Sequence, residues 1–399
     1  MEWPRGIRQR RAHRTLEQWS NVFKLFLNLA GIDTPAMTQL SKEQERTLTA
    51  ADGTVEQVAK YLHGVGDSTN QLARLMGGGF GVGLITRIVR GYTFVSRNYQ
   101  LGDRIYLVGF SRGSYTVRAL AGLISAKGLL SPTDVGTVDN KGPGYRLGAA
   151  AWYQWRHEVL HAQGHPLEHF EEIMLDLPGF LRQPPRPGSL VRAPIEVVAV
   201  WDTVGALGIP DFNRQHVAVD LFQFADTVLS TNVHFGRHAI SIDEKRGSFT
   251  PSLWDPDPNR PNRIIQVLFP GAHADVGGGY PLANNESGLS DGTLRWMGYE
   301  LKALGVQFAS ASTVVPKPDA AGVAHQPWNA SLWRDLPRAK RPLPAGLSLS
   351  KSVLDRINAG PVKPDPAAAE PALYRPTNLA QYVDRNGPLL AVQVVNGYR

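Results

Sequence analysis

The chain contains no cysteine. Structural disulfides, zinc sites with cysteine ligands, iron–sulfur clusters and thiol nucleophiles are therefore excluded. The absence of cysteine fits either a reducing or an oxidising compartment. The sequence also lacks any apolar run of about 18 residues, so we expect no simple membrane-spanning helix, which does not exclude contact with a membrane surface.

The chain also has only a small excess of one sign of charge. The 42 Lys and Arg residues exceed the 35 Asp and Glu residues by a formal net charge of +7, and this excess is thinly spread. Arginine is frequent before residue 15, but Glu17 and Lys24 interrupt the apolar residues that follow, so we expect no secretory signal peptide. The arginine pairs lack interleaved aromatic residues, and we expect no nucleic-acid partner.

The composition nevertheless allows a large core. The 399 residues are 42% hydrophobic and include 9 Trp, 12 Tyr and 14 Phe, which is too apolar and aromatic for a disordered chain. This length suits either one enlarged α/β domain or more than one domain.

Three short apolar runs predict strands that are buried on both faces: 105–110, 195–201 and 264–269. A helix is predicted directly after the first run, at 115–126. Buried strands separated by helical segments indicate an α/β fold with a mostly parallel sheet flanked by helices. Chemistry in such folds collects in the loops after the carboxyl ends of the strands.

The rest of the chain is assigned from periodicity and composition. Apolar spacing predicts helices at 16–30 and 84–95, and we also expect a helical stretch around His234 and His238. The polar residues 38–60 look like a connection. Residues 131–193 form an insertion too long for a plain crossover, and we interpret them as a helical cap within a catalytic domain of residues 1–313. The Pro/Ala-rich region 314–399 is expected to pack on the core with little regular structure.

Residues 108–115, Val-Gly-Phe-Ser-Arg-Gly-Ser-Tyr, contain the pattern G-x-S-x-G between the first predicted strand and its helix. In α/β-hydrolases this pattern forms a sharp turn that exposes a nucleophilic serine and leaves room only for small neighbours. Ser111 is therefore the candidate nucleophile, and the backbone N–H of Arg112 is a candidate oxyanion donor. The alternative is a tight turn with a helix-capping serine.

A serine nucleophile needs a base and an acid that orients the base. Asp202 directly follows the strand 195–201, and His273 lies shortly after the strand 264–269. These residues give the chain order Ser, Asp, His of α/β-hydrolases. We predict a triad of Ser111, Asp202 and His273, with Asp243 and Asp275 as competing acids and with no metal or cofactor.

One motif favours different chemistry. His157-Glu158-Val159-Leu160-His161 is an H-E-x-x-H pattern, which on a helix places two zinc ligands on one face. Leu167 stands where the extended metzincin pattern has its third histidine. We interpret the segment as a polar cap helix, and a zinc hydrolase using His157 and His161 stays an alternative. The glycine-rich segment 77–83 fits no phosphate-binding pattern and predicts a loop.

Taken together, the motifs resemble the α/β-hydrolase family that contains the first class of type VI secretion lipase effectors. The resemblance runs from about Ser20 to the end of the chain, and the segments that carry it are 109–122, 201–205, 242–246, 269–280, 289–297 and 374–379. It implies the same triad, Ser111, Asp202 and His273. The family pattern begins with an apolar strand ending in Phe-Asp-Gly-Thr, where this chain has arginine-rich residues. We therefore expect that strand, and the second oxyanion donor in its loop, to be missing.

The resemblance implies a phospholipase that bacteria inject into rival cells. Its substrate would be a phospholipid membrane surface, and its partners a spike protein of the secretion apparatus and an immunity protein. The implied route is synthesis in the bacterial cytoplasm and delivery to the periplasm of target cells. The alternative from another class is a catalytically weakened or inactive homologue that acts as a binding or delivery module.

Overall fold

The computed structural model describes residues 18–34, 43–64, 80–137, 141–162, 190–204, 227–330, 333–335, 337–386 and 394–395. The chain divides into two compact units. Unit 1 comprises residues 1–30, 199–204 and 237–399, and unit 2 comprises residues 31–198 and 205–236. The sequence-based boundary at residue 313 and the cap role of residues 131–193 stay predictions.

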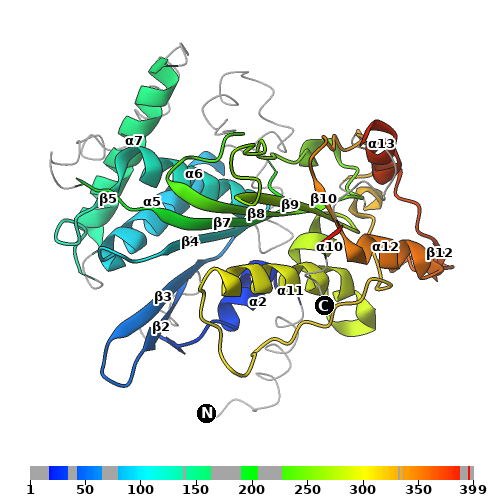
Figure 1. The fold of residues 1–399 in the computed structure, drawn as a ribbon, viewed down its shortest axis with the longest axis horizontal. Helices are drawn as coiled ribbons and strands as arrows, with labels where there is room; N and C mark the ends of the chain where they lie inside the picture. Colours follow the sequence, from blue (N-terminus) through cyan, green and yellow to red (C-terminus); the bar gives the residue numbers. More distant parts are fainter. Residues whose placement is uncertain are drawn as a thin grey trace, which may run out of the picture. The chain divides into compact units, whose positions relative to one another are not determined.

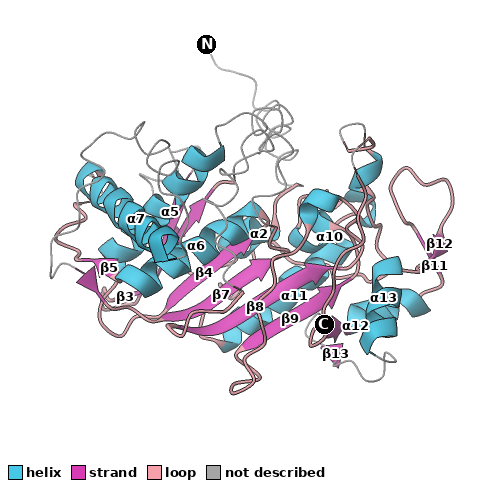
Figure 2. Cartoon of the chain, turned by 90° about the horizontal axis from the view of Figure 1, so that it is seen from above, coloured by secondary structure: helices cyan, strands magenta, loops and turns pink. Residues whose placement is uncertain are grey.

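The main sheet confirms the predicted α/β class. Its six strands follow the order β13-β10-β9-β8-β7-β4, and Figure 2 shows β7, β8 and β9 running side by side. The pairs β9–β10 and β10–β13 are parallel. The bounds are β4 Ile105–Phe110, β7 Ile195–Trp201, β8 Val233–Ser241, β9 Ile264–Phe269, β10 Ser348–Ser350 and β13 Val394–Val395.

The predicted strands β4, β7 and β9 have the same bounds in the structure. All of β7 except its second residue is buried, and the last four residues of β9 are buried. A strand covered on both faces has no polar alternation, which is why β7 and β9 could be recognised as continuous apolar runs. The expected burial on both faces is wrong for β4, whose residues alternate between buried and half-buried because β4 lies at the edge of the sheet.

Three helices pack together in unit 2 (Figure 1). They are α5 Phe80–Asn98, α6 Arg112–Lys127 and α7 Gly142–Ala162. Helices α5 and α6 confirm the two predicted helical segments, and α7 lies within the predicted insertion. Strands β5 Leu129–Leu130 and β6 Leu190–Val191 pair antiparallel at the two ends of that insertion.

The polar segment 38–60 was wrongly interpreted as a connection. Its described part forms β2 Glu43–Thr49 and β3 Val55–Leu62, an antiparallel hairpin that β1 Ile32–Asp33 extends. Lys60 of β3 makes ion pairs of 2.7 Å with Glu43 and 2.9 Å with Glu45 of β2. Cross-strand charge pairs therefore help to stabilise this hairpin. A hairpin held by an apolar face would instead have shown alternating apolar residues in the sequence.

The helical stretch expected around His234 and His238 is also wrong, because both residues lie in β8. The strand is buried from Gly236 to Ser241. Its buried polar side chains have partners: His238 Nε2 accepts the backbone N–H of Thr203 at 3.1 Å, and Arg237 donates to Glu300 at 2.6 Å. These polar residues in an interior strand hid its apolar character.

In unit 1, helix α2 Asn21–Leu27 packs on helix α11 Gly288–Ala303, and the two lie together in Figure 1. Helix α2 is shorter than the predicted 16–30. Lys24 and Asp291 form a buried ion pair of 2.9 Å. The Asn21 amide donates to the carbonyls of Val276 and Ser290, which ties α2 to the short helix after β9 and to α11.

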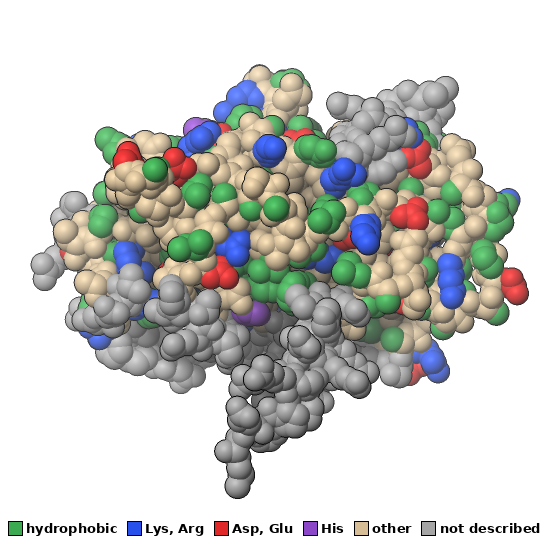
Figure 3. Space-filling model, turned by 90° about the horizontal axis from the view of Figure 1, so that it is seen from below, with side chains coloured by type: hydrophobic (Ala, Val, Ile, Leu, Met, Phe, Trp, Pro, Cys, Tyr) green, Lys and Arg blue, Asp and Glu red, His purple; other side chains and the backbone are tan. Residues whose placement is uncertain are grey.

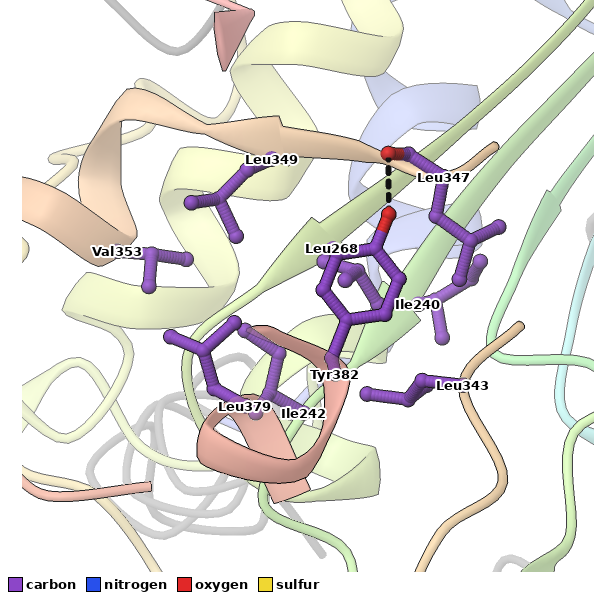
Figure 4. Packing of buried hydrophobic residues seen from close by; sticks show 9 residues of the cluster. All are labelled: Ile240, Ile242, Leu268, Leu343, Leu347, Leu349, Val353, Leu379 and Tyr382. Atoms are coloured by element: carbon purple, nitrogen blue, oxygen red, sulfur yellow. Dashed lines mark hydrogen bonds between the residues drawn. The ribbon is translucent and has the colours of Figure 1, made fainter. Parts of the chain in front are cut away.

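The region after residue 313 is more regular than its composition indicated. It contributes β10, α12 Lys351–Asn358, the pair β11 Pro361–Val362 and β12 Ala372–Leu373, and α13 Thr377–Asn386. Figure 4 shows the apolar cluster that fixes this region to β8 and β9, and the Tyr382 hydroxyl donates to the Leu347 carbonyl at 2.9 Å. The cluster consists of Ile240, Ile242, Leu268, Leu343, Leu347, Leu349, Val353, Leu379 and Tyr382.

On the face drawn in Figure 3, the described basic and acidic side chains are interspersed rather than gathered by sign. In the part of the chain that the structure describes, we find no helix with both the length and the hydropathy of a membrane span.

Candidate active site

Ser111 lies in the turn between β4 and α6, with φ 57° and ψ −123°. A positive φ is uncommon for any residue but glycine and strains the backbone. The carbonyl of Ser111 accepts the N–H groups of Ser114 at 3.1 Å and Tyr115 at 3.3 Å, so the helix begins at once. This conformation is the strained strand-to-helix turn that the motif predicted.

The close approach of strand and helix accounts for one of the two glycines of the motif. A Cβ atom at Gly109 would lie 2.5 Å from the carbonyl oxygen of Gly113, which no side chain tolerates. A Cβ at Gly113 would have no neighbour within 4 Å among the described atoms. Packing therefore requires glycine at position 109, whereas a side chain at position 113 would have room.

Asp202 and His273 form a close histidine–carboxylate contact at the carboxyl ends of the central strands. Asp202 follows β7, and His273 begins the short helix α10 His273–Gly277 after β9. His273 Nδ1 lies 2.6 Å from Asp202 Oδ2. Asp202 is fully buried and His273 is 6% exposed. The structure thus brings together two residues that lie 71 positions apart in the chain.

Backbone hydrogen bonds at the strand ends explain why Asp202 and His273 lie in contact. The N–H of Asp202 donates to Ala239 of β8 at 2.7 Å, and the N–H of Ile242 donates to Phe269 of β9 at 3.0 Å. The ends of β7, β8 and β9 are therefore aligned, as parallel strands require. Gly271, with φ 101°, turns the chain after β9, and a Cβ atom there would lie 2.3 Å from the Cβ of Asp275.

The Asp202 carboxylate has four further donors. Oδ1 accepts Ser241 N–H at 2.9 Å and Arg341 Nη1 at 2.6 Å, and Oδ2 accepts Arg341 Nη2 at 2.9 Å and Ser241 Oγ at 3.3 Å. Burial on its own raises the pKa of Asp202, but Arg341 and His273 outweigh burial and hold the pKa far below its usual range. Asp202 is therefore ionised near neutral pH.

His273 is held on two further sides. Its backbone N–H donates to Glu244 Oε2 at 3.2 Å. The rings of Phe249 and His273 pack in a T-shaped arrangement, with 4.9 Å between their centroids. Burial lowers the pKa of His273, and the Asp202 carboxylate opposes that effect without cancelling it. A neutral imidazole whose Nδ1 is bonded to a carboxylate is suited to act as a general base near neutral pH.

The two competing acids have other partners. Asp243 Oδ2 accepts the N–H of Gly271 at 2.7 Å and the hydroxyl of Tyr374 at 2.8 Å. Asp275 lies 2.6 Å from Nδ1 of His325 and accepts the N–H of Ala272 at 2.8 Å. Burial raises the pKa of each of these carboxyl groups. Their contacts fix the loop that carries His273, whereas Asp202 contacts the imidazole itself.

The H-E-x-x-H segment lies in the second half of α7. The Glu158 carboxylate makes a 2.5 Å ion pair with Lys127, and the His157 ring stacks on Tyr153. Among the described residues, no group of three or more His, Asp and Glu side chains could hold a metal ion. His165 and His169, which follow this motif in the sequence, lie outside the described residues. The segment 77–83 was predicted to be a loop: Gly77, Gly78 and Gly79 lie outside the described residues, but the prediction is wrong for the rest of the segment, because it forms the first turn of α5.

We expect replacement of both His157 and His161 by Gln to change ester hydrolysis by less than about tenfold, because the predicted triad of Ser111, Asp202 and His273 would supply the nucleophile, the base and the orienting acid without them. Activity and elemental zinc content should be measured on the same purified samples. Stoichiometric zinc in the wild type, lost together with hydrolysis in the double variant, would establish the zinc mechanism instead.

Sequence reasoning missed Arg341 and Ser241. Arg341 lies in the Pro-rich region and has no motif around it, and Ser241 ends the strand that was misassigned. Arg341 is nevertheless 5% exposed and contacts both oxygens of Asp202. Only the three-dimensional structure brings such distant residues together.

Comparison with known proteins decides the family. Residues 6–300 match the family model described as "T6SS, Phospholipase effector Tle1-like, catalytic domain". This chain belongs to that family. The match includes Ser111, Asp202 and His273 and ends before Arg341. The residues before position 18, where the family's first strand was expected to be missing, lie outside the described part of the chain.

Other similarities are weaker. A Saccharomyces cerevisiae protein named "Uncharacterized protein YEL023C" is 26% identical over 219 residues, which are 52% of this chain and 28% of that protein. A solved structure of an uncharacterized protein from Pseudomonas aeruginosa is 19% identical with a TM-score of 0.34, over 86% of this chain and 47% of that one. A Tle1 effector bound to the VgrG spike is 16% identical with a TM-score of 0.25, over 53% and 31%. The chain thus spans under a third of the curated relative.

Proposed function

We propose that this chain is a serine esterase that hydrolyses acyl esters of phospholipids. The observation that carries the proposal is the buried pair of His273 and Asp202, joined at 2.6 Å at the carboxyl ends of the sheet. Membership of a phospholipase effector family and the strained turn at Ser111 support it independently.

In the proposed mechanism the Ser111 hydroxyl attacks the ester carbonyl carbon while His273 takes the hydroxyl proton. We assign this transfer to Nε2, because Nδ1 is bonded to Asp202. Collapse of the tetrahedral intermediate breaks the ester C–O bond, and His273 gives the proton to the departing lysophospholipid oxygen. Water, deprotonated by the same imidazole, then releases the fatty acid from Ser111.

Two groups stabilise charge in this mechanism. Asp202 holds the imidazole in the tautomer that has its proton on Nδ1 and stabilises the imidazolium that forms. The backbone N–H of Arg112, the first residue of α6, is the proposed donor to the oxyanion. No metal or cofactor takes part in these steps.

The test combines hydrolysis with covalent labelling. Purified protein is incubated with phospholipid vesicles, released fatty acid and lysophospholipid are quantified, and a fluorophosphonate probe is mapped by mass spectrometry. Release of both products together with labelling of Ser111 supports the serine mechanism. Folded protein that neither hydrolyses nor becomes labelled would support the alternative of an inactive binding or delivery module. Chelator-sensitive hydrolysis without labelling would support the zinc alternative.

We expect the acidic limb of the pH profile of kcat/KM to fall below about pH 6.5, the ordinary pKa of histidine. The base must be neutral, and burial lowers the pKa of His273, so the neutral form persists to lower pH. The profile should be measured with a soluble ester whose own ionisation is constant. A limb above about pH 7 would contradict the assignment of His273 as a buried base.

We further propose an antibacterial role for this activity, with delivery by a secretion spike into the periplasm of rival cells and neutralisation by an immunity protein. The family description as a T6SS effector supports this proposal. Expression in the periplasm of a bacterial host, behind an added leader, should stop growth with Ser111 intact and not with Ser111→Ala. Equal growth in both cases would contradict the antibacterial role.

A further inference from the structure

Arg341 makes five hydrogen bonds around the carboxylate that orients His273. Its two terminal nitrogens contact one Asp202 oxygen each, at 2.6 and 2.9 Å. The same guanidinium donates to the Ser241 carbonyl at 2.6 Å, to the Ser241 hydroxyl at 2.7 Å and to the Phe249 carbonyl at 2.7 Å. A planar guanidinium that engages both carboxylate oxygens fixes the rotation of that carboxylate as well as its position.

The fixed rotation matters because the two Asp202 oxygens have different tasks. Oδ2 faces His273 Nδ1 at 2.6 Å, and Oδ1 accepts the Ser241 N–H at 2.9 Å. Rotation of the carboxylate about the Cβ–Cγ bond of Asp202 would break both contacts. Arg341 spans the two oxygens and opposes that rotation.

The C-terminal region in turn holds Arg341. Its backbone N–H donates to Asn378 Oδ1 at 3.2 Å, and Asn378 Nδ2 donates to the carbonyl of Ile242 at 2.8 Å, directly after β8. Leu343 and Leu379 belong to the same apolar cluster (Figure 4). Apolar packing and hydrogen bonds therefore both place Arg341 against the end of the sheet.

The charge of Arg341 also bears on His273. Charged groups that act on this imidazole include the Asp202 carboxylate, Glu244 at its backbone N–H, and Arg246. Arg341 partly neutralises the Asp202 carboxylate, which weakens the preference of the imidazole for its protonated form. A positive charge here thus helps to keep His273 neutral while the guanidinium keeps Asp202 oriented.

We infer that Arg341 is a positioning residue of the hydrolase, so that the region after the family's matched catalytic domain completes the catalytic machinery. This inference rests on the proposed serine mechanism. It assigns a function to a residue outside positions 6–300, where the family match ends.

The test uses Arg341→Gln and Arg341→Lys, with Arg338→Gln as the matched control. Arg338 is exposed and its side chain donates to Asn329. Circular dichroism and thermal unfolding establish the folded fraction of each protein. We expect Arg341→Gln to lower kcat about 100-fold, to leave KM within about threefold and to move the acidic limb of the pH profile upward by about half a pH unit or more.

Arg341→Lys separates charge from geometry. A lysine keeps the positive charge but cannot bridge both oxygens, so kcat should fall about tenfold while the acidic limb stays near that of the wild type. If Arg341→Gln does not fold, this variant decides the question. The control Arg338→Gln should match the wild type in every measurement. A folded Arg341→Lys protein with kcat within about threefold of the wild type overturns the inference.

A measurement independent of activity distinguishes failure of the inference about Arg341 from failure of the proposed serine mechanism. In a Ser111→Ala background, NMR of labelled histidines follows the Nδ1 proton and the pKa of His273 with and without Arg341→Gln. A raised pKa and a shifted proton signal support the inference, and unchanged values overturn it. If the mechanism itself is wrong, the wild type shows no Ser111 labelling, whatever Arg341 does.

Discussion

Replacement of Ser111 by Ala is expected to reduce ester hydrolysis at least about 1,000-fold, equivalent to about 4 kcal/mol of transition-state stabilisation. The variant removes only the proposed nucleophilic oxygen, and the turn between β4 and α6 keeps its backbone bonds. Initial rates of fatty-acid release from vesicles, normalised to folded protein, measure the effect. The fluorophosphonate should no longer label the variant.

Two companion variants make this result specific. Ser125 lies in the same helix, and its hydroxyl has no hydrogen-bond partner among the described residues, so Ser125→Ala should keep full activity. Ser111→Gly should be as inactive as Ser111→Ala and at least as stable as the wild type, because glycine adopts φ 57° without strain. Wild-type activity in Ser111→Ala would rule out the serine mechanism.

The strand that precedes Ser111 shows what could be predicted from sequence. Strands β4, β7 and β9 have the predicted bounds because each is a continuous apolar run. Burial on both faces explains such a run in β7 and in the last four residues of β9, whereas β4, at the edge of the sheet, alternates between buried and half-buried residues. Ser111, Asp202 and His273 could be selected because each follows such a strand. The position of a candidate site residue is thus predictable when the element that carries it has a strong local signal.

The elements that were missed have weaker local signals. Strand β8 carries His and Arg side chains whose partners, such as the Thr203 N–H and Glu300, are distant in the sequence. The hairpin of β2 and β3 relies on cross-strand ion pairs that form only after the strands meet. Propensity and periodicity describe neighbours along the chain, and these contacts are not between such neighbours.

Arg341 illustrates the same limit within the site. It lies 139 positions after Asp202, in a segment whose proline content indicated little regular structure. The geometry of its guanidinium against Asp202 is set by Asn378 and the apolar cluster. Sequence alone gives no reason to choose this arginine over its exposed neighbour Arg338.

The largest effect is expected for Asp202→Asn, which should lower kcat about 10,000-fold. The carboxylate oxygen that accepts His273 Nδ1–H at 2.6 Å becomes part of an amide. An amide group that donates to Nδ1 favours the tautomer with its proton on Nε2, and that tautomer cannot take the proton of Ser111. KM should change much less than kcat, because in the proposed mechanism Asp202 acts on His273 rather than on substrate.

A second consequence of Asp202→Asn must be separated from the first. The substitution leaves the buried Arg341 without its carboxylate partner, and breaking a buried charge pair typically lowers the free energy of unfolding by about 3–5 kcal/mol. Rates should therefore be expressed per folded molecule, with denaturant unfolding measured on the same protein. Combining Asp202→Asn with Arg341→Gln removes the unpaired charge, so it should recover part of the stability and none of the activity.

Asp243→Asn and Asp275→Asn are the matched controls for the choice of acid. Both carboxyl groups are buried at the same end of the sheet, but they bond to Tyr374 and His325 rather than to His273. Each substitution should reduce kcat by less than about 100-fold, through displacement of the loop that carries His273. A loss at either position that exceeds the loss at Asp202 would assign the role of orienting acid to that residue. The contact of Arg341 with Asp202 would then have no role in orienting His273.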